Sequence, residues 1–163
     1  MPRRKQDSRK TLVTDAREVI HACAGMNIRA AERQITRFLE ARMRGIDLSI
    51  AQFGLMAHIA AVGDDTIGAL AERLSLDQST LSRNLRSLER DGLIEIAVVD
   101  ADLRRRAIWL TEEGARRLET AIPLWRRAHE ALSALIDPRD VRRIAAATTA
   151  LAKRADGKIS AAS

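Results

Sequence analysis

Residues 77–91 are predicted to form a helix, and short hydroxyl and guanidinium side chains lie on one face of it. On a helical wheel at about 100° per residue, Leu85 and Leu88 fall within about 40° of Leu81 and form an apolar face. The opposite face carries Ser79, Ser82, Arg83, Arg86 and Arg90. Small hydroxyls permit close approach to a DNA major groove, and arginine can donate two hydrogen bonds to guanine O6 and N7. This face therefore indicates recognition of duplex DNA.

The amino end of the same helix carries Ser79 and Thr80, where we expect the positive end of the helix dipole to face a phosphate. An ordinary amphipathic helix with a solvated charged face is the alternative. The preceding segment favours DNA binding, because Thr66 caps a short helix that runs to Leu74 and a tight turn follows. Asp77 then caps the second helix, which completes a helix-turn-helix pattern.

Two alternating segments after this helix predict a β-hairpin, with strands over residues 93–99 and 106–110. The connecting turn carries Asp102, Arg104 and Arg105. An arginine at a hairpin tip can enter a narrow minor groove, whereas a solvated charged turn is the alternative. A hairpin directly after a helix-turn-helix predicts a winged helix.

Helices are predicted on both sides of this winged helix-turn-helix. A long helix is expected over residues 12–44 and ends near Gly45, and Ser49 with Gln52 forms a capping box for the next helix. Thr111 caps a helix that runs to about Ile136. Its apolar residues repeat every 3.5 positions, which is typical of a helix packed along a partner helix. A last helix follows Asp137 and Pro138.

Composition agrees with a mainly α-helical protein that has a small β wing. Only 3 Pro and 8 Gly occur in 163 residues, and aromatic residues make up 2%, too few for a platform that stacks single-stranded bases. The net charge is +6, but residues 79–106 hold six Arg against five Asp or Glu. The argument for DNA therefore depends on which face carries the arginines. Much of the excess charge lies in residues 1–11, expected to be a disordered basic tail that is either solvated or touches phosphates.

Three stretches carry a resemblance to a known family: IGALAERLSLDQSTLSRNLRSLERDGLIE, DLRRRAIWLTEEGARRL and AIPLWRRAH. They resemble the MarR family of bacterial regulators, over roughly residues 12–152. The resemblance implies an obligate homodimer with a winged helix-turn-helix in each subunit. It also implies transcription control, usually repression, that responds to a ligand or an oxidant. The matching positions in the groove-reading helix are Ser79, Thr80, Ser82, Arg83 and Arg86. In the wing, Asp102 and Arg104 match the family's Asp-x-Arg, while Leu103 stands where Arg or Gly is usual.

On this basis we expect five regions, with a tail at either end, residues 1–11 and 156–163. Residues 12–44 form the first dimerisation helix, residues 45–111 form the DNA-binding lobe, and residues 112–155 form the C-terminal dimerisation helices. The expected partner is a pseudo-palindromic double-stranded operator, from which a small molecule releases the protein. A winged-helix module that binds only proteins is an alternative from another class.

The single cysteine, Cys23, offers another alternative, because some relatives sense hydroperoxides with a cysteine in the first helix, assisted by tyrosines. The chain has no Tyr, and no neighbouring residue indicates a depressed thiol pKa. By our alignment, Gly25 stands where the reactive cysteine would be. We expect a buried structural cysteine rather than a thiol-based oxidant sensor, with a place in the lining of a ligand pocket as the third possibility.

Effector contacts are expected from polar groups between the DNA-binding lobe and the dimerisation helices: Asn27, Arg29, His58 and His129. The three histidines lack metal-ligand spacing, and no nucleophile, paired-carboxylate or phosphate-loop motif appears, so we predict neither a metal, nor a cofactor, nor an enzyme. No apolar run reaches the length of a membrane span and no signal peptide opens the chain. We expect a cytoplasmic protein that associates with the nucleoid through DNA and not with a membrane.

Overall fold

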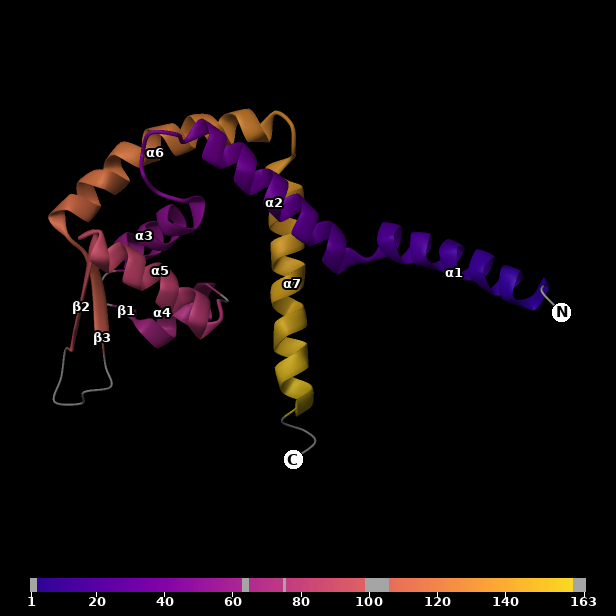
Figure 1. Ribbon diagram of the computed structural model, residues 1–163. Helices are drawn as coiled ribbons and strands as arrows, with labels where there is room; N and C mark the ends of the chain where they lie inside the picture. Colours follow the sequence, from indigo (N-terminus) through magenta and orange to yellow (C-terminus); the bar gives the residue numbers. More distant parts are fainter. Residues whose placement is uncertain (1–2, 63–64, 75, 99–105, 160–163) are drawn as a thin grey trace. The chain divides into compact units, whose positions relative to one another are not determined.

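The computed structural model describes residues 3–62, 65–74, 76–98 and 106–159 (Figure 1). It is mostly helical with a small antiparallel sheet, which confirms the predicted fold class. The chain divides into two units, residues 1–38 and 39–163. Each unit is described by itself.

The N-terminal helix is longer than expected and is interrupted. Helix α1 spans Arg3–Ala22 and α2 spans Ala24–Arg42, so the prediction of one helix over residues 12–44 is wrong. The break lies at Cys23, and the Asn27 side-chain amide donates a 2.9 Å hydrogen bond to the carbonyl of His21 near the end of α1. Gly25, a poor helix former, follows the break. The expected disordered tail over residues 1–11 is also corrected, because residues 3–11 are helical and contain neither Gly nor Pro.

The second unit contains the helix-turn-helix. Helix α3 spans Ile50–Val62, α4 spans Ile67–Leu74 and α5 spans Gln78–Arg90. The predicted capping box is confirmed, since Gln52 N donates to Ser49 Oγ at 3.1 Å and Ser49 N donates to Gln52 Oε1 at 2.9 Å. Thr66 caps α4 as predicted, accepting a 3.2 Å hydrogen bond from Ala69 N. The centre of the lobe is formed by fully buried side chains: Met56, Leu70, Leu81, Leu88, Ile94 and Ile108.

The sheet has one strand more than the predicted hairpin. Strands β2 (Ile94–Val98) and β3 (Arg106–Leu110) pair antiparallel, with Ile96 opposite Ile108. The additional strand, β1 (Asp65–Thr66), pairs with the other edge of β3, which gives the order β1-β3-β2. A strand of two residues next to a helix cap has no periodicity to detect, so the sequence could not predict it.

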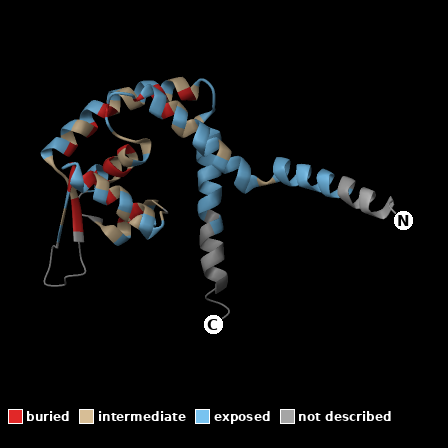
Figure 2. Ribbon diagram, viewed as in Figure 1, coloured by how far each residue is buried: buried red, intermediate tan, exposed pale blue. Residues whose placement is uncertain are grey.

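The C-terminal part consists of α6 (Glu112–Ser133) and α7 (Pro138–Ile159). Helix α6 ends three residues before the predicted Ile136 and contains Pro123. Every described side chain of α7 from Val141 onward is exposed (Figure 2). Leu135, which precedes α7, is 71% exposed, and Leu151 within it is 64% exposed. The second unit alone therefore leaves the apolar side of α7 uncovered.

The side-chain hydroxyl of Thr111 links the turn that follows α5 to the start of α6. Thr111 Oγ1 accepts a 3.0 Å hydrogen bond from Gly114 N, which caps α6, and donates a 2.7 Å hydrogen bond to the carbonyl of Gly92. Gly92 has φ of +69°, a left-handed conformation that turns the chain out of α5. The Thr111 hydroxyl thus fixes α6 to this turn.

We expect Thr111→Ala to lower the free energy of unfolding by about 1–2 kcal/mol, because the variant loses the helix cap and leaves the Gly92 carbonyl without this donor. Urea unfolding of the full chain measures this loss. Thr111→Ser keeps the hydroxyl and serves as the control. Equal stability of the alanine and serine variants would contradict the assigned role.

Candidate nucleic-acid interface

Helix α5 has one buried apolar face and one exposed polar face, as the sequence predicts. Leu81 and Leu88 are fully buried and Leu85 is 2% exposed, so three leucines anchor the helix in the lobe. Ser79, Arg83 and Arg86 are exposed, while Thr80 and Ser82 are half-buried. A helix that buries one side and presents hydroxyls and arginines on the other has the form of a groove-reading helix. That these five residues contact DNA stays a prediction.

The three arginines of α5 differ in the hydrogen bonds that their side chains already make. Arg90 donates to Asp91 Oδ1 at 3.2 Å and to Ser87 Oγ at 3.0 Å. Among the described residues, Arg83 makes only a long hydrogen bond, of 3.4 Å, to Ser79 Oγ. Arg86 has no hydrogen bond or ion pair with any residue that the structure describes. Arg86 is therefore the arginine that a base or phosphate can engage without breaking an existing bond.

Asp77 organises the first turn of α5. Its Oδ1 accepts from Thr80 N at 2.9 Å and from Ser79 Oγ at 2.5 Å, and its Oδ2 accepts from Thr80 Oγ1 at 2.7 Å. The hydrogen bonds donated by Ser79 and Thr80 hold the pKa of the Asp77 carboxyl well below its usual value. An ionised carboxylate thus occupies the position at the helix terminus where the sequence suggested a phosphate.

The carboxyl end of α5 is connected to the start of α3. Gln52 Nε2 donates a 3.2 Å hydrogen bond to Ser87 Oγ, which itself contacts Asp91 Oδ2 at 3.4 Å. The capping-box side chain of α3 thereby also holds the recognition helix. The sequence predicted the box but not this link, because the pair lies 35 positions apart.

The predicted wing contacts Asp102, Arg104 and Arg105 lie outside the described residues. The strands on either side of this turn, β2 and β3, are joined by a side-chain hydrogen bond that the sequence did not predict. Trp109 Nε1 donates to Glu95 Oε2 at 3.0 Å, and these residues are direct partners across β2 and β3. This bond ties the two strands together on the exposed side of the hairpin.

The predicted effector contacts are divided between the two units. Asn27 and Arg29 belong to the first unit, and the Asn27 amide is already bound to the His21 carbonyl. His58 and His129 belong to the second unit, where His58 Nδ1 lies 2.8 Å from the Gly54 carbonyl oxygen.

The sequence did not predict the aromatic contacts of His129. Its ring stacks on Trp125 with centroids 4.8 Å apart, and Trp125 stacks on Phe53 of α3 at 6.1 Å. The His129 Nδ1 atom is buried and has no hydrogen-bond partner within the described chain. Buried polar atoms of this kind are rare, which makes His129 the most informative of the four candidates.

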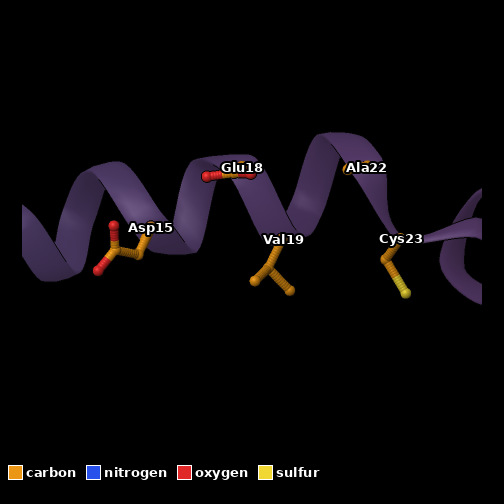
Figure 3. A pocket seen from close by; sticks show the side chains of 5 residues that line it. All are labelled: Asp15, Glu18, Val19, Ala22 and Cys23. Atoms are coloured by element: carbon orange, nitrogen blue, oxygen red, sulfur yellow. The ribbon is translucent and has the colours of Figure 1, made fainter.

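Cys23 is a half-buried free thiol rather than a fully buried core residue. It lines a hollow of about 450 Å³ on the first unit, together with Asp15, Glu18, Val19 and Ala22 (Figure 3). Val19 and Cys23 point to the same side of the helix (Figure 3). The described residues contain no cluster of His, Cys, Asp and Glu suited to a metal. None of the described helices is long and apolar enough to cross a membrane.

Comparison with known proteins identifies similar chains. The profile of the MarR family matches residues 46–105. The chain is similar to the solved structure of the transcriptional regulator MosR from Mycobacterium tuberculosis in complex with DNA, at 34% identity and a TM-score of 0.73. That match covers 80% of this chain and 97% of MosR.

Two further matches agree with this one. The transcriptional regulator HosA of Escherichia coli is 37% identical over 78 residues, which is 48% of this chain and 58% of HosA. The match thus spans little more than half the length of that curated relative. A mutant of Escherichia coli MarR, solved with operator DNA, has a TM-score of 0.69 at 23% identity and supports the fold; that match covers 82% of this chain and 96% of MarR.

Proposed function

Because the chain belongs to the MarR family of DNA-binding transcriptional regulators, we propose that it is a homodimeric repressor that a small molecule releases from its operator. The observation that carries the proposal is the sorting of α5, with three buried leucines on one side and exposed Ser79, Arg83 and Arg86 on the other. We assign DNA contacts to these three residues with Thr80 and Ser82, and wing contacts to Asp102, Arg104 and Arg105. Residues 45–111 are the proposed DNA-binding lobe.

Dimerisation is proposed for residues 12–44 and 112–155. Both segments expose large apolar side chains, which single soluble chains seldom leave uncovered in groups. In α1, Leu12 is 66% and Val19 60% exposed, and in α7, Val141 is 43% and Ile144 48% exposed. A second copy of the chain would cover them, and the two lobes would then meet half-sites about 34–36 Å apart.

The effector is proposed to contact the chain through Asn27, Arg29, His58 or His129. The buried, unpartnered Nδ1 of His129 supports the last of these, since a ligand could supply the missing partner. A regulator that binds DNA would act in the cytoplasm, on the nucleoid.

A salt-dependent gel shift on the promoter of the gene's own operon tests the proposal. We expect the protein to shift the promoter DNA with an affinity that falls steeply as salt rises. Each phosphate neutralised by Lys or Arg makes the slope of log K against log salt more negative by about 0.9. Light scattering is expected to give the mass of two chains. A monomer, or an affinity independent of salt, would contradict the proposal and favour a protein-interaction module.

A further inference from the structure

We propose that the first turn of α5 reads the amino groups of bases, because Ser79 and Thr80 offer DNA only hydrogen-bond acceptors. The operator strand that faces this turn would then carry adenine or cytosine rather than guanine or thymine. The inference rests on the proposed function and names what one part of the same interface recognises.

The acceptor character follows from where the hydroxyl protons are. Asp77 accepts from Ser79 Oγ at 2.5 Å and from Thr80 Oγ1 at 2.7 Å. An ionised carboxylate has no proton to give, so each hydroxyl must donate its only proton to it. What remains on Ser79 and Thr80 is oxygen lone pairs. Ser79 is exposed and uses one of its lone pairs to accept a long 3.4 Å hydrogen bond from Arg83, while Thr80 is half-buried.

The same arrangement disfavours a phosphate at this turn. The Asp77 carboxylate already binds the Thr80 backbone N–H at 2.9 Å, and it places a negative charge at the positive end of the helix dipole. A phosphate would meet this charge and would find no free hydroxyl proton. The usual attraction of a helix amino end for phosphate is therefore opposed at α5 by the Asp77 carboxylate.

Major-groove chemistry then selects the base. The hydrogen-bond donors on the base edges of this groove are adenine N6 and cytosine N4, while guanine presents the acceptors O6 and N7 and thymine presents O4. Acceptors on Ser79, Thr80 and Asp77 suit the amino groups. Arg83 and Arg86, one to two turns further on, are donors and suit guanine. Helix α5 is thus divided into an acceptor end and a donor end.

Selection of binding sites from a randomised duplex library, with the full chain, tests the inference. We expect the wild type to enrich adenine or cytosine at one position of each half-site. Ser79→Ala keeps the cap between Asp77 and Thr80 N, and it should lose that preference and so reduce the ratio of operator affinity to random-DNA affinity. Asp77→Asn keeps a helix cap, because Asn and Asp cap equally well.

The Asp77→Asn variant has a more specific expected result. Its amide N–H can donate to Thr80 Oγ1, which frees the hydroxyl proton to point outward. Guanine or thymine should then be accepted at the base that faces Thr80, whereas Ser79 still donates to the remaining side-chain oxygen and keeps its preference. Arg83→Ala is the matched control, and it should alter a different position of the half-site.

A base analogue checks the atom itself. Removing the amino group of the selected adenine or cytosine should weaken wild-type binding roughly 3- to 10-fold, and should leave Ser79→Ala unchanged. The inference is overturned if both variants enrich the wild-type bases, or if Ser79→Ala weakens operator and random DNA equally, as loss of a phosphate contact would. If the wild type enriches no sequence at all, the proposed function itself fails.

Discussion

Replacing Gly114 with alanine is expected to lower the free energy of unfolding by about 3 kcal/mol or more, the upper range for overpacking a well-packed site. In a chain of this size, such a loss lowers the melting temperature by roughly 6–12 °C. Thermal unfolding of the full chain measures it. Gly114 is buried in the first turn of α6.

The cause is a backbone contact that leaves no room for a side chain. A Cβ on Gly114 would overlap the carbonyl oxygen of Leu93 and would lie 2.9 Å from its carbonyl carbon. Leu93 cannot move away freely, because its carbonyl accepts from Thr111 N at 3.1 Å and its side chain is 2% exposed. The added methyl group must therefore displace α6 from the residues that follow the recognition helix.

Gly54→Ala is the matched control for this variant. Gly54 lies inside α3, and a Cβ there meets nothing within 4 Å. Alanine should leave stability unchanged or raise it by up to about 1 kcal/mol, because alanine favours a helix. Equal effects of the two substitutions would show that the Gly114 contact does not constrain the fold.

The second large effect is expected for Arg86→Ala, which should weaken binding to the operator by about 1–3 kcal/mol, or roughly 5- to 150-fold, if Arg86 reads a base. Arg86 is exposed and has no partner among the described residues, so its removal costs the fold little. Gel shifts with operator and random DNA measure the change. A base contact reduces the ratio of the two affinities, whereas a phosphate contact weakens both equally.

Arg116→Ala is the control with the same change of charge. Arg116 is exposed on α6 and pairs with Glu113 at 3.2 Å, away from the helix-turn-helix in the sequence. We expect it to alter operator affinity by less than roughly twofold, since exposed ion pairs contribute little. If Arg86→Ala preserves the preference for operator over random DNA, Arg86 is not a base-reading residue.

Features that short sequence patterns encode were predicted well. Ser49, Thr66, Asp77 and Thr111 cap helices as expected, because a side chain that caps a helix acts within three residues of its own position. The burial of one face of α5 was predicted equally well, since periodicity alone determines it. The fold class follows from these elements together.

Features that depend on distant residues were not predicted. The hydrogen bonds from Gln52 to Ser87 and from Trp109 to Glu95 join residues that come together only in the folded chain. The need for glycine at position 114 arises from Leu93, on another element. At the candidate site, residue types indicated hydroxyls and arginines, but only the geometry of Asp77 indicated which hydrogen bonds the hydroxyls can still make.

The ring stack of Phe53, Trp125 and His129 contains a tryptophan that can serve as an intrinsic fluorescence probe. The chain has two Trp and no Tyr, so its ultraviolet emission comes from Trp109 on the hairpin and Trp125 in the stack. Replacing Trp109 with phenylalanine leaves an emitter at the contact of α3 with α6, and replacing Trp125 leaves one on the wing. The two variants would therefore allow an effector and an operator to be followed separately, without any attached dye.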